Sequence, residues 1–319
     1  MAWYFFVFIF VISCIVLSWL SSHLIKSLVQ VARYLRWREF IIAFFVMAFA
    51  ASLPDLFVGL NAVYHRLPEL AFGDIIGGNL VDLTLVLAIA VFFGKKGLST
   101  QSDMVQKSAI VTALVAVLPL ILIWDGRLDR IDGVILIVTF FLYSWWLFSK
   151  KERFKKTYKD NNKSSIKGFK SFLVNLVNVV VLVALLLVAS QVVVSSAQFF
   201  SSALGISLAL VGILIVGLGN CFPEIYFSVV SARREENWLV LGDLMGSVII
   251  CATLVLGIIA LVLPFEIKNP YPFIAARVFL VIAVVFSLVF IRTGKKLSKK
   301  EGLILLFIYI AFLLVEVFM

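Results

Sequence analysis

Two carboxylates stand beside prolines inside apolar stretches of this sequence. The segments "SLPDL" at 52–56 and "FPEIY" at 222–226 place Asp55 and Glu224 directly after a proline. Proline cannot donate a hydrogen bond to the carbonyl four residues earlier in a helix, so the Ala50 carbonyl is expected to be free. Water, a hydroxyl or a cation could satisfy it. The adjacent carboxylates favour the cation, because calcium and sodium prefer oxygen ligands.

More polar residues follow in the next apolar stretch after each of these segments. Apart from Arg38 at the edge of the first of them, the four apolar stretches that hold these motifs, at 38–62, 70–93, 207–231 and 238–263, contain no lysine or arginine to neutralise Asp55, Asp82 and Glu224. If these apolar stretches span a membrane, carboxylates without a basic partner in them indicate a functional site. For Asp74 and Asp243, capping of a broken helix or pairing with a polar neighbour remains an alternative. Residues at i, i+4 and i+8 share one helical face. Asp74, Gly78 and Asp82 have this spacing in the first half of the chain, and Asp243, Ser247 and Cys251 have it in the second half.

The elements that must position these residues are long and apolar. Of the 319 residues, 63% are hydrophobic and 14% are charged. An apolar helix of about 20 residues crosses a bilayer, and the short alternating strands of a membrane barrel are absent from the sequence. We therefore predict an all-α integral membrane protein with ten transmembrane helices. The predicted spans are 3–22, 38–62, 70–93, 107–124, 131–149, 171–200, 207–231, 238–263, 273–291 and 302–318.

The distribution of basic residues predicts the orientation. The formal net charge is +10, and 23 of the 28 lysines and arginines lie in or next to alternate connections between the predicted spans. Basic connections stay in the cytoplasm, so both ends of the chain are expected outside. Basic loops of this kind favour anionic lipid as a partner. The positive net charge of the chain is explained in this way, without binding to nucleic acid. The longest polar segment, at 150–170, is predicted to be a basic cytoplasmic linker.

The chain contains an internal repeat. One constant shift along the chain aligns "PDL" at 54–56 with "PEI" at 223–225, "GDIIG" at 73–77 with "GDLMG" at 242–246, and "TLVL" at 84–87 with "TLVL" at 253–256. The paired glycines form small-xxx-small patterns, which allow helices to pack closely. Each half, 1–149 and 171–319, holds five predicted spans, so the second half must enter the membrane in the opposite sense. Inverted repeats with a site at the midplane are typical of secondary transporters.

Other kinds of chemistry find little support. Three cysteines, Cys14, Cys221 and Cys251, lie in predicted spans and indicate no disulfide framework. The two histidines lie near opposite membrane edges, so a zinc site of histidine and cysteine is not expected. No catalytic triad or phosphate-binding glycine loop is present in the sequence. We therefore predict that the protein is not an enzyme and has no permanently bound cofactor.

Taken together, these motifs resemble the cation/calcium antiporter superfamily, and in particular prokaryotic sodium/calcium exchangers. The first copy reads "AASLPD" and then "GDIIGGN", and the second reads "GNCFPE" and then "GDLMGSV". The resemblance implies that Asp55 and Glu224 are the central calcium ligands. It further implies supporting roles for the side chains of Asp82, Cys251, Ser52 and Ser247, and for the carbonyls of Ala48 and Gly217.

The sequence departs from the family pattern at several positions around this site. In the family signature, Gly-Thr-Ser-Leu-Pro-Glu is followed by Gly-Asn-x-x-Gly-Ser-Asn. The departures remove ligands from the usual sodium sites, so the identity of the coupling ion stays open among sodium, protons and potassium. The departing residues are Ala51, Asn220, Cys221, Gly78, Asp74 and Asp243.

The resemblance implies antiport of calcium against sodium in a prokaryotic inner membrane. An empty negative site crosses the membrane at high cost, which enforces exchange rather than leak. The first and sixth spans would be the mobile pair. Proton-coupled exchange by the same fold is the nearest alternative, and a channel or a non-transporting sensor is an alternative of another class.

Overall fold

Helices make up nearly all of the described chain. The computed structural model describes residues 2–34, 47–149, 169–267 and 271–318. The helices up to residue 149 are α1 (Ala2–Tyr34), α3 (Met47–Ala51), α4 (Leu53–Tyr64), α5 (Pro68–Val81), α6 (Leu87–Phe93), α7 (Asp103–Leu122) and α8 (Arg130–Ser149). Those after it are α9 (Phe169–Leu204), α10 (Leu208–Leu210), α11 (Gly217–Asn220), α12 (Phe222–Arg233), α13 (Asn237–Ile250), α14 (Leu256–Val262), α15 (Ile274–Arg292) and α16 (Lys299–Phe318).

Short segments of other types connect or interrupt these helices. Three are π-helical: η2 (Asp82–Val86), η4 (Val211–Val216) and η5 (Cys251–Val255). Two are 3-10 turns: η3 (Ile123–Asp125) and η6 (Tyr271–Phe273). The sequence did not predict strands, but four strands of two residues each form two antiparallel pairs, β1 with β4 and β2 with β3. The strands are β1 (Leu98–Ser99), β2 (Arg127–Leu128), β3 (Phe265–Glu266) and β4 (Lys296–Leu297).

The described helices are those of a multi-pass membrane protein. Eight are long and apolar enough to cross a bilayer, and the stretch Ala48–Tyr64 is a shorter apolar helix. The predicted span 38–62 begins outside the described residues, and most of the predicted linker 150–170 also lies outside them. The predicted span 302–318 lies within α16, a helix of twenty residues that is not one of the eight.

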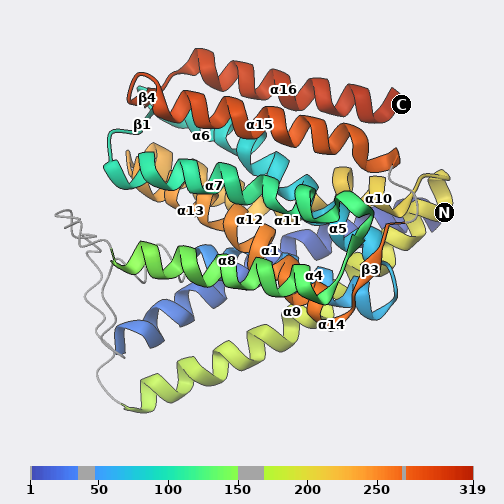
Figure 1. Ribbon diagram of the computed structural model, residues 1–319. Coiled ribbons are helices and arrows are strands. Elements are labelled where there is room, and N and C mark those ends of the chain that lie inside the picture. Colours follow the sequence, from blue (N-terminus) through green and yellow to red (C-terminus); the bar gives the residue numbers. More distant parts are fainter. Residues whose placement is uncertain (1, 35–46, 150–168, 268–270, 319) are drawn as a thin grey trace.

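The bounds of the elements recur at the shift that relates the two halves of the sequence. Thus α4 (53–64) corresponds to α12 (222–233), and α5 (68–81) corresponds to α13 (237–250). The π-helical turns η2 and η5, the helices α6 and α14, and the helices α8 and α16 follow the same spacing. The strand pair β1–β4 lies at one end of the bundle, and β3 lies at the other end with the start of α1 and the end of α16 (Figure 1).

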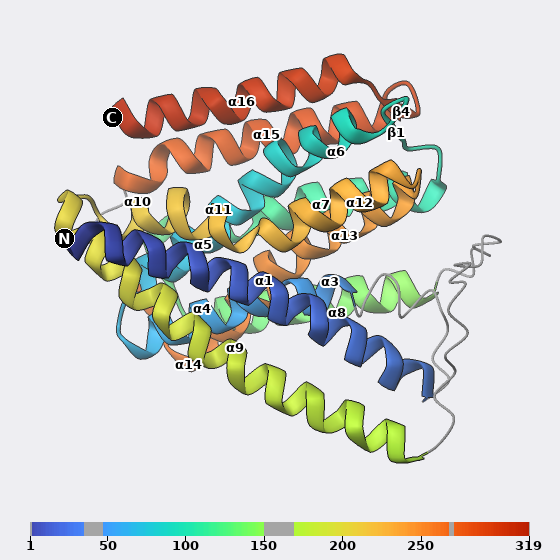
Figure 2. The ribbon, with the colours of Figure 1, turned by 180° about the vertical axis from the view of Figure 1, so that it is seen from behind.

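Two long helices lie side by side across one face of the bundle. Figure 2 shows α1 and α9 in this position. Their aromatic side chains interlock, with the rings of Phe6 and Phe199 stacked at 3.8 Å and those of Phe10 and Phe200 edge to face at 5.4 Å. Many of their other side chains are apolar and exposed, as expected of helices in contact with lipid.

Glycines allow α5 to pack directly against the backbone of α10 and η4. A Cβ atom at Gly73 would lie 2.7 Å from the Ala209 carbonyl oxygen, and one at Gly77 would collide with the backbone of Ile213. Side chains larger than hydrogen at these positions would force these elements apart. The packing interpretation of this small-xxx-small pattern is therefore confirmed.

A polar contact joins α9 to α4. The Asn61 amide donates hydrogen bonds to Ser190 Oγ at 2.5 Å and to the Leu187 carbonyl at 3.2 Å. Hydrogen bonds between membrane helices are worth about 0.6 kcal/mol on average and up to about 1.7 kcal/mol. This pair links two elements that are 129 residues apart in the sequence.

We expect Ser190→Ala to lower the free energy of unfolding by about 1 kcal/mol, because Asn61 loses an acceptor on α9. Denaturation in mixed detergent micelles measures the change. Ser195→Ala is the matched control, since the Ser195 hydroxyl donates within its own helix, to the Gln191 carbonyl. Equal destabilisation by the two substitutions would contradict a role for this contact.

Candidate functional site

Five carboxyl groups gather where the two broken helices meet their neighbours. Asp55 lies in the first turn of α4 and Glu224 in the first turn of α12. Asp74 and Asp243 lie on α5 and α13, and Asp82 begins η2. Asp55 is partly buried, and the other four side chains are at most 6% exposed. The structure thus brings together every carboxylate that the sequence singled out.

The negative charges of this cluster act on one another. Asp55 is close enough to repel Asp74, Asp82 and Glu224, and Asp243 is close enough to repel Asp82 and Glu224. The ion pairs seen among the described residues lie elsewhere, between Lys95 and Glu235 and between Arg127 and Glu266. Buried like charges are costly unless a cation or protons offset them.

The break in the first helix differs from the expectation in one respect. The Ala50 carbonyl, predicted to be free for a cation, accepts a hydrogen bond from Ser21 Oγ of α1 at 2.9 Å. The hydroxyl alternative is therefore correct for this carbonyl. The Ala48 carbonyl accepts from both the backbone N–H and the hydroxyl of Ser52, at 3.1 and 3.0 Å. In this conformation the Ala48 carbonyl is therefore occupied by hydrogen bonds from Ser52.

Residues from the two halves meet directly at the breaks. Ser52 Oγ lies 3.4 Å from Ser247 Oγ. Cys251 Sγ donates a hydrogen bond to Asp55 Oδ2 at 3.1 Å. Gly217 packs so closely on α5 that a Cβ atom there would lie 2.7 Å from the Gly78 nitrogen. Gly78 was not among the predicted site residues, whereas the other residues named in these contacts were.

Asp74 has a specific partner that the sequence did not reveal. The Asn220 Nδ2 group donates to both carboxylate oxygens of Asp74, at 3.1 Å each. Asn220 Oδ1 is buried and has no hydrogen-bond partner among the described residues. Asp74 therefore orients the Asn220 amide, so that its carbonyl oxygen remains as a potential ligand.

Several buried oxygens of the cluster are unsatisfied. Within the described residues, Asp82 Oδ1, Glu224 Oε2 and Asn220 Oδ1 have no hydrogen-bond partner. Burial of an unsatisfied polar atom is costly, and native proteins rarely leave one without a partner or a bound ion. All three are acceptors, and no positively charged side chain of the described structure reaches them. They are suited to a cation.

A further unsatisfied oxygen belongs to a residue that was not predicted from the sequence. Ser228 is fully buried, and its hydroxyl has no partner among the described residues. It lies four residues after Glu224 and so on the same face of α12. That spacing was a usable signal, but the corresponding position in the first half is Gly59, so the repeat did not point to it.

The carboxylates alone do not form a metal cage. Among the described residues, no three His, Cys, Asp or Glu side chains lie together as a group that could hold a metal ion. A cation here must also use hydroxyl and carbonyl oxygens, such as those of Ser52, Ser247 and Asn220. Calcium and sodium accept mixed oxygen ligands of this kind.

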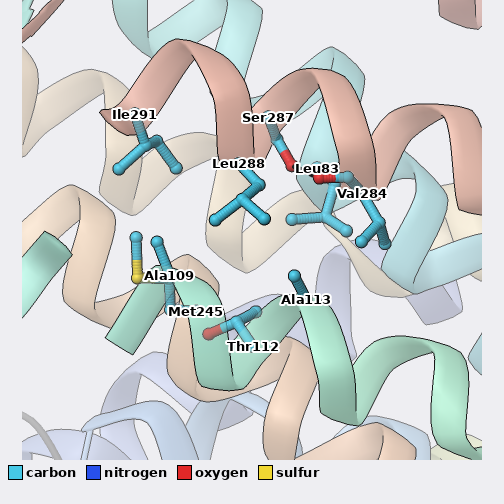
Figure 3. A pocket seen from close by; sticks show the side chains of 9 residues that line it. All are labelled: Leu83, Ala109, Thr112, Ala113, Met245, Val284, Ser287, Leu288 and Ile291. Carbon is cyan, nitrogen blue, oxygen red and sulfur yellow. Dashed lines mark hydrogen bonds between the residues drawn. The ribbon is translucent and has the colours of Figure 1, made fainter. Parts of the chain in front are cut away.

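A neighbouring cavity does not extend the site. It lies between α7 and α15, as Figure 3 shows, and has a volume of about 10 Å³, about enough for one water molecule. Its two hydroxyls, of Thr112 and Ser287, donate to carbonyls of their own helices. The other lining residues are Leu83, Ala109, Ala113, Met245, Val284, Leu288 and Ile291, and all are apolar.

A protein-family comparison matches most of the chain. The family model described as "Sodium/calcium exchanger protein" matches residues 5–149 and again residues 174–318. The two matched ranges are related by the same shift as the sequence repeat. The match covers well over half of the chain.

Curated relatives span the same length. Inner membrane protein YrbG of Escherichia coli is 26% identical, with 83% of this chain and 82% of the relative covered. Sodium/calcium exchanger MaX1 of Methanosarcina acetivorans is 24% identical, with 92% and 93% covered. The putative antiporter CaxA of Alkalimonas amylolytica is 25% identical, with 94% and 95% covered.

Solved structures show the same fold. The sodium-calcium exchanger NCX_Mj, studied with sodium and strontium, aligns with a TM-score of 0.66 and 25% sequence identity, over 96% of each chain. The same exchanger with sodium and no calcium aligns with a TM-score of 0.66, over 96% of this chain and 97% of the other.

Proposed function

The chain belongs to the sodium/calcium exchanger protein family, and we propose that it exchanges calcium for sodium across a membrane by alternating access. The observation that carries this proposal is the set of buried, unsatisfied acceptor oxygens on Asp82, Glu224 and Asn220. The exchangers among its relatives support the choice of ions. A prokaryotic inner membrane is the proposed location, by similarity to YrbG.

We assign the central ligand roles to Asp55 and Glu224. Each begins a helix after a proline break, where the positive end of the helix dipole favours a negative group. Asp82 assists them, and Asp243 adds charge nearby. Oxygens from Ser52, Ser247, Asn220 and Ser228 complete the proposed set, together with the Gly217 carbonyl and, once its helix end opens, the Ala48 carbonyl. Cys251 holds Asp55 in place.

The proposed architecture is two inverted repeats, 1–149 and 171–319, joined by the cytoplasmic linker 150–170. The double match of the family model supports it, as does the recurrence of element bounds. Each half would cross the membrane five times, with both ends of the chain outside. Inversion would place equivalent strands at opposite ends of the bundle, and β4 and β3 lie at opposite ends in Figure 1.

Exchange rather than leak follows from the charge of the site. A cluster of five carboxyls cannot move between the two sides of a membrane unless it is neutralised. Either calcium or the coupling ions must therefore be bound at each change of state. We assign the movement to α1 and α9, which lie together on one face of the bundle.

The charge balance also favours a second candidate, proton-coupled exchange by the same fold. Up to five negative charges face a calcium ion that supplies two positive ones. The remaining groups need protons or further cations. Asp74 and Asp243 stand where the family carries asparagine, and are the additional carboxyls that raise this charge.

Calcium uptake into proteoliposomes separates the two candidates. We expect an imposed sodium gradient to drive radioactive calcium into the vesicles, with little uptake when potassium or choline replaces sodium. Uptake that follows a pH gradient and ignores sodium would instead support proton coupling. Absence of calcium movement under both gradients would contradict the proposed function.

A further inference from the structure

A polar cavity of about 370 Å³ lies at the end of the bundle that carries β1 and β4. Three connections line it, those between α6 and α7, between α12 and α13, and between α15 and α16. It is separate from the carboxylate cluster. The lining residues are Lys95, Lys96, Gly97, Ser99, Gln101, Ala232, Glu235, Asn237, Lys295 and Lys296.

The lining of this cavity is strongly basic. Four lysines face one carboxylate, and that carboxylate is already paired, with Lys95 Nζ 3.4 Å from Glu235 Oε1. Lys96, Lys295 and Lys296 have no carboxylate partner in the part of the chain that the structure describes. Serine and amide side chains add neutral hydrogen-bond donors. An excess of lysine with such donors matches the oxygens of a phosphate group.

Backbone pairing brings together the segments that carry these lysines. Ser99 of β1 pairs with Lys296 of β4, and the Thr100 N–H donates to the Lys295 carbonyl at 3.0 Å. Gly97 has a left-handed φ of +79°, and a side chain there would collide with the Leu297 carbonyl. The pair β1–β4 thus places lysines from two distant loops around one cavity before any ligand binds.

The fold itself does not require three of these lysines. Under the shift that relates the two halves, Pro264, Phe265 and Gly126 take the places of Lys95, Lys96 and Lys295 at the opposite end of the bundle. Only Lys296 has a basic counterpart, Arg127, and Arg66 takes the place of Glu235. The cavity therefore belongs to the end where the basic residues gather, next to the anionic surface of a membrane.

We propose that this cavity binds a phosphate group, carried by the headgroup of an anionic lipid or present as free inorganic phosphate. The bound group would tie the α12–α13 connection to the connections on either side of it. Binding does not depend on the transport function, so it is measured without ion flux.

The test compares two probes on the purified full-length protein in neutral detergent. Short-chain phosphatidylglycerol is titrated against phosphatidylcholine, whose phosphate is neutralised within its own headgroup. Sodium phosphate is titrated separately against sodium chloride at equal ionic strength. The shift of the thermal unfolding midpoint reports binding. Stabilisation by phosphatidylglycerol alone identifies the lipid headgroup, and stabilisation by both probes identifies the phosphate group itself.

The decisive variant replaces the four lysines with glutamine. We expect the apparent affinity for the stabilising probe to fall roughly tenfold or more, because each lysine near an anionic group contributes to the attraction. A matched control removes four positive charges from exposed residues at the same end but outside the cavity, with Lys107, Arg292, Lys299 and Lys300 changed to glutamine. The control should bind as wild type does.

Two results would overturn the proposal: equal loss of affinity in both variants, or no stabilisation of the wild-type protein by either probe. If the variant without the four lysines does not fold, Glu235→Gln still tests the proposal. It removes the one negative charge of the lining and frees Lys95, so the affinity should rise several-fold. Unchanged or weaker binding in Glu235→Gln would count against the site.

Discussion

Replacing Glu224 with glutamine is expected to abolish calcium uptake by the reconstituted protein. The substitution keeps the shape of the side chain and removes its charge. Loss of one partner from a buried charge pair costs about 3–5 kcal/mol, so calcium affinity should fall roughly 100-fold or more. Glu224 Oε2 has no hydrogen-bond partner within the described structure. The substitution therefore removes a contact with the bound calcium ion rather than a contact with another side chain. Uptake of radioactive calcium into proteoliposomes under a sodium gradient measures the effect.

Glu316→Gln is the matched control for this experiment. Glu316 is also a buried carboxylate with an unpartnered oxygen among the described residues, but it lies near the end of α16, outside the cluster. Its loss should leave uptake within about twofold of wild type. If Glu224→Gln retained full uptake, the assignment of Glu224 as a central ligand would be wrong.

Gly77→Ala is expected to lower the free energy of unfolding by about 1–3 kcal/mol, the usual cost of overpacking a close contact. The added methyl group would meet the carbonyl oxygen and Cα of Ile213, which are backbone atoms and cannot turn aside. Helices α5 and η4 would have to separate. Because α11 follows η4 directly and carries Asn220, which donates to Asp74 of α5, the site should loosen as well.

The adjacent residue provides the control. A methyl group at Gly78 would lie 3.8 Å from Cys221 Sγ, an ordinary contact distance. Gly78→Ala has the same change in helix propensity as Gly77→Ala, so the difference between the two isolates the packing. Denaturation in mixed micelles compares them. Equal stabilities would show that the close approach of α5 and η4 is not stabilising.

The composition of the site was largely predictable from the sequence. Asp74 and Asp82 are two helical turns apart on one face, and the repeat supplies Asp243 and Cys251 at corresponding places. Periodicity and duplication are properties of the linear order of residues. They were therefore sufficient to predict which carboxylates gather in the apolar interior.

The partners of individual oxygens were not predictable in the same way. The Ala50 carbonyl bonds to Ser21, which is 29 residues earlier, and Asp74 bonds to Asn220, which is 146 residues later. Either oxygen could have been left for a cation. Which one is satisfied by the protein depends on which helix packs beside it, and the sequence pattern does not state that.

The sequence by itself determined that this chain is a helical membrane protein with a duplicated pattern of buried acidic residues. Hydropathy, periodicity and one constant shift between the two halves suffice for that, because each is local or linear. Only the tertiary structure decided that Asp82, Glu224, Asn220 and Ser228 keep unsatisfied oxygens, and that lysines from two loops surround one cavity. These features arise from contacts between distant segments, whose geometry is set by packing across the whole bundle.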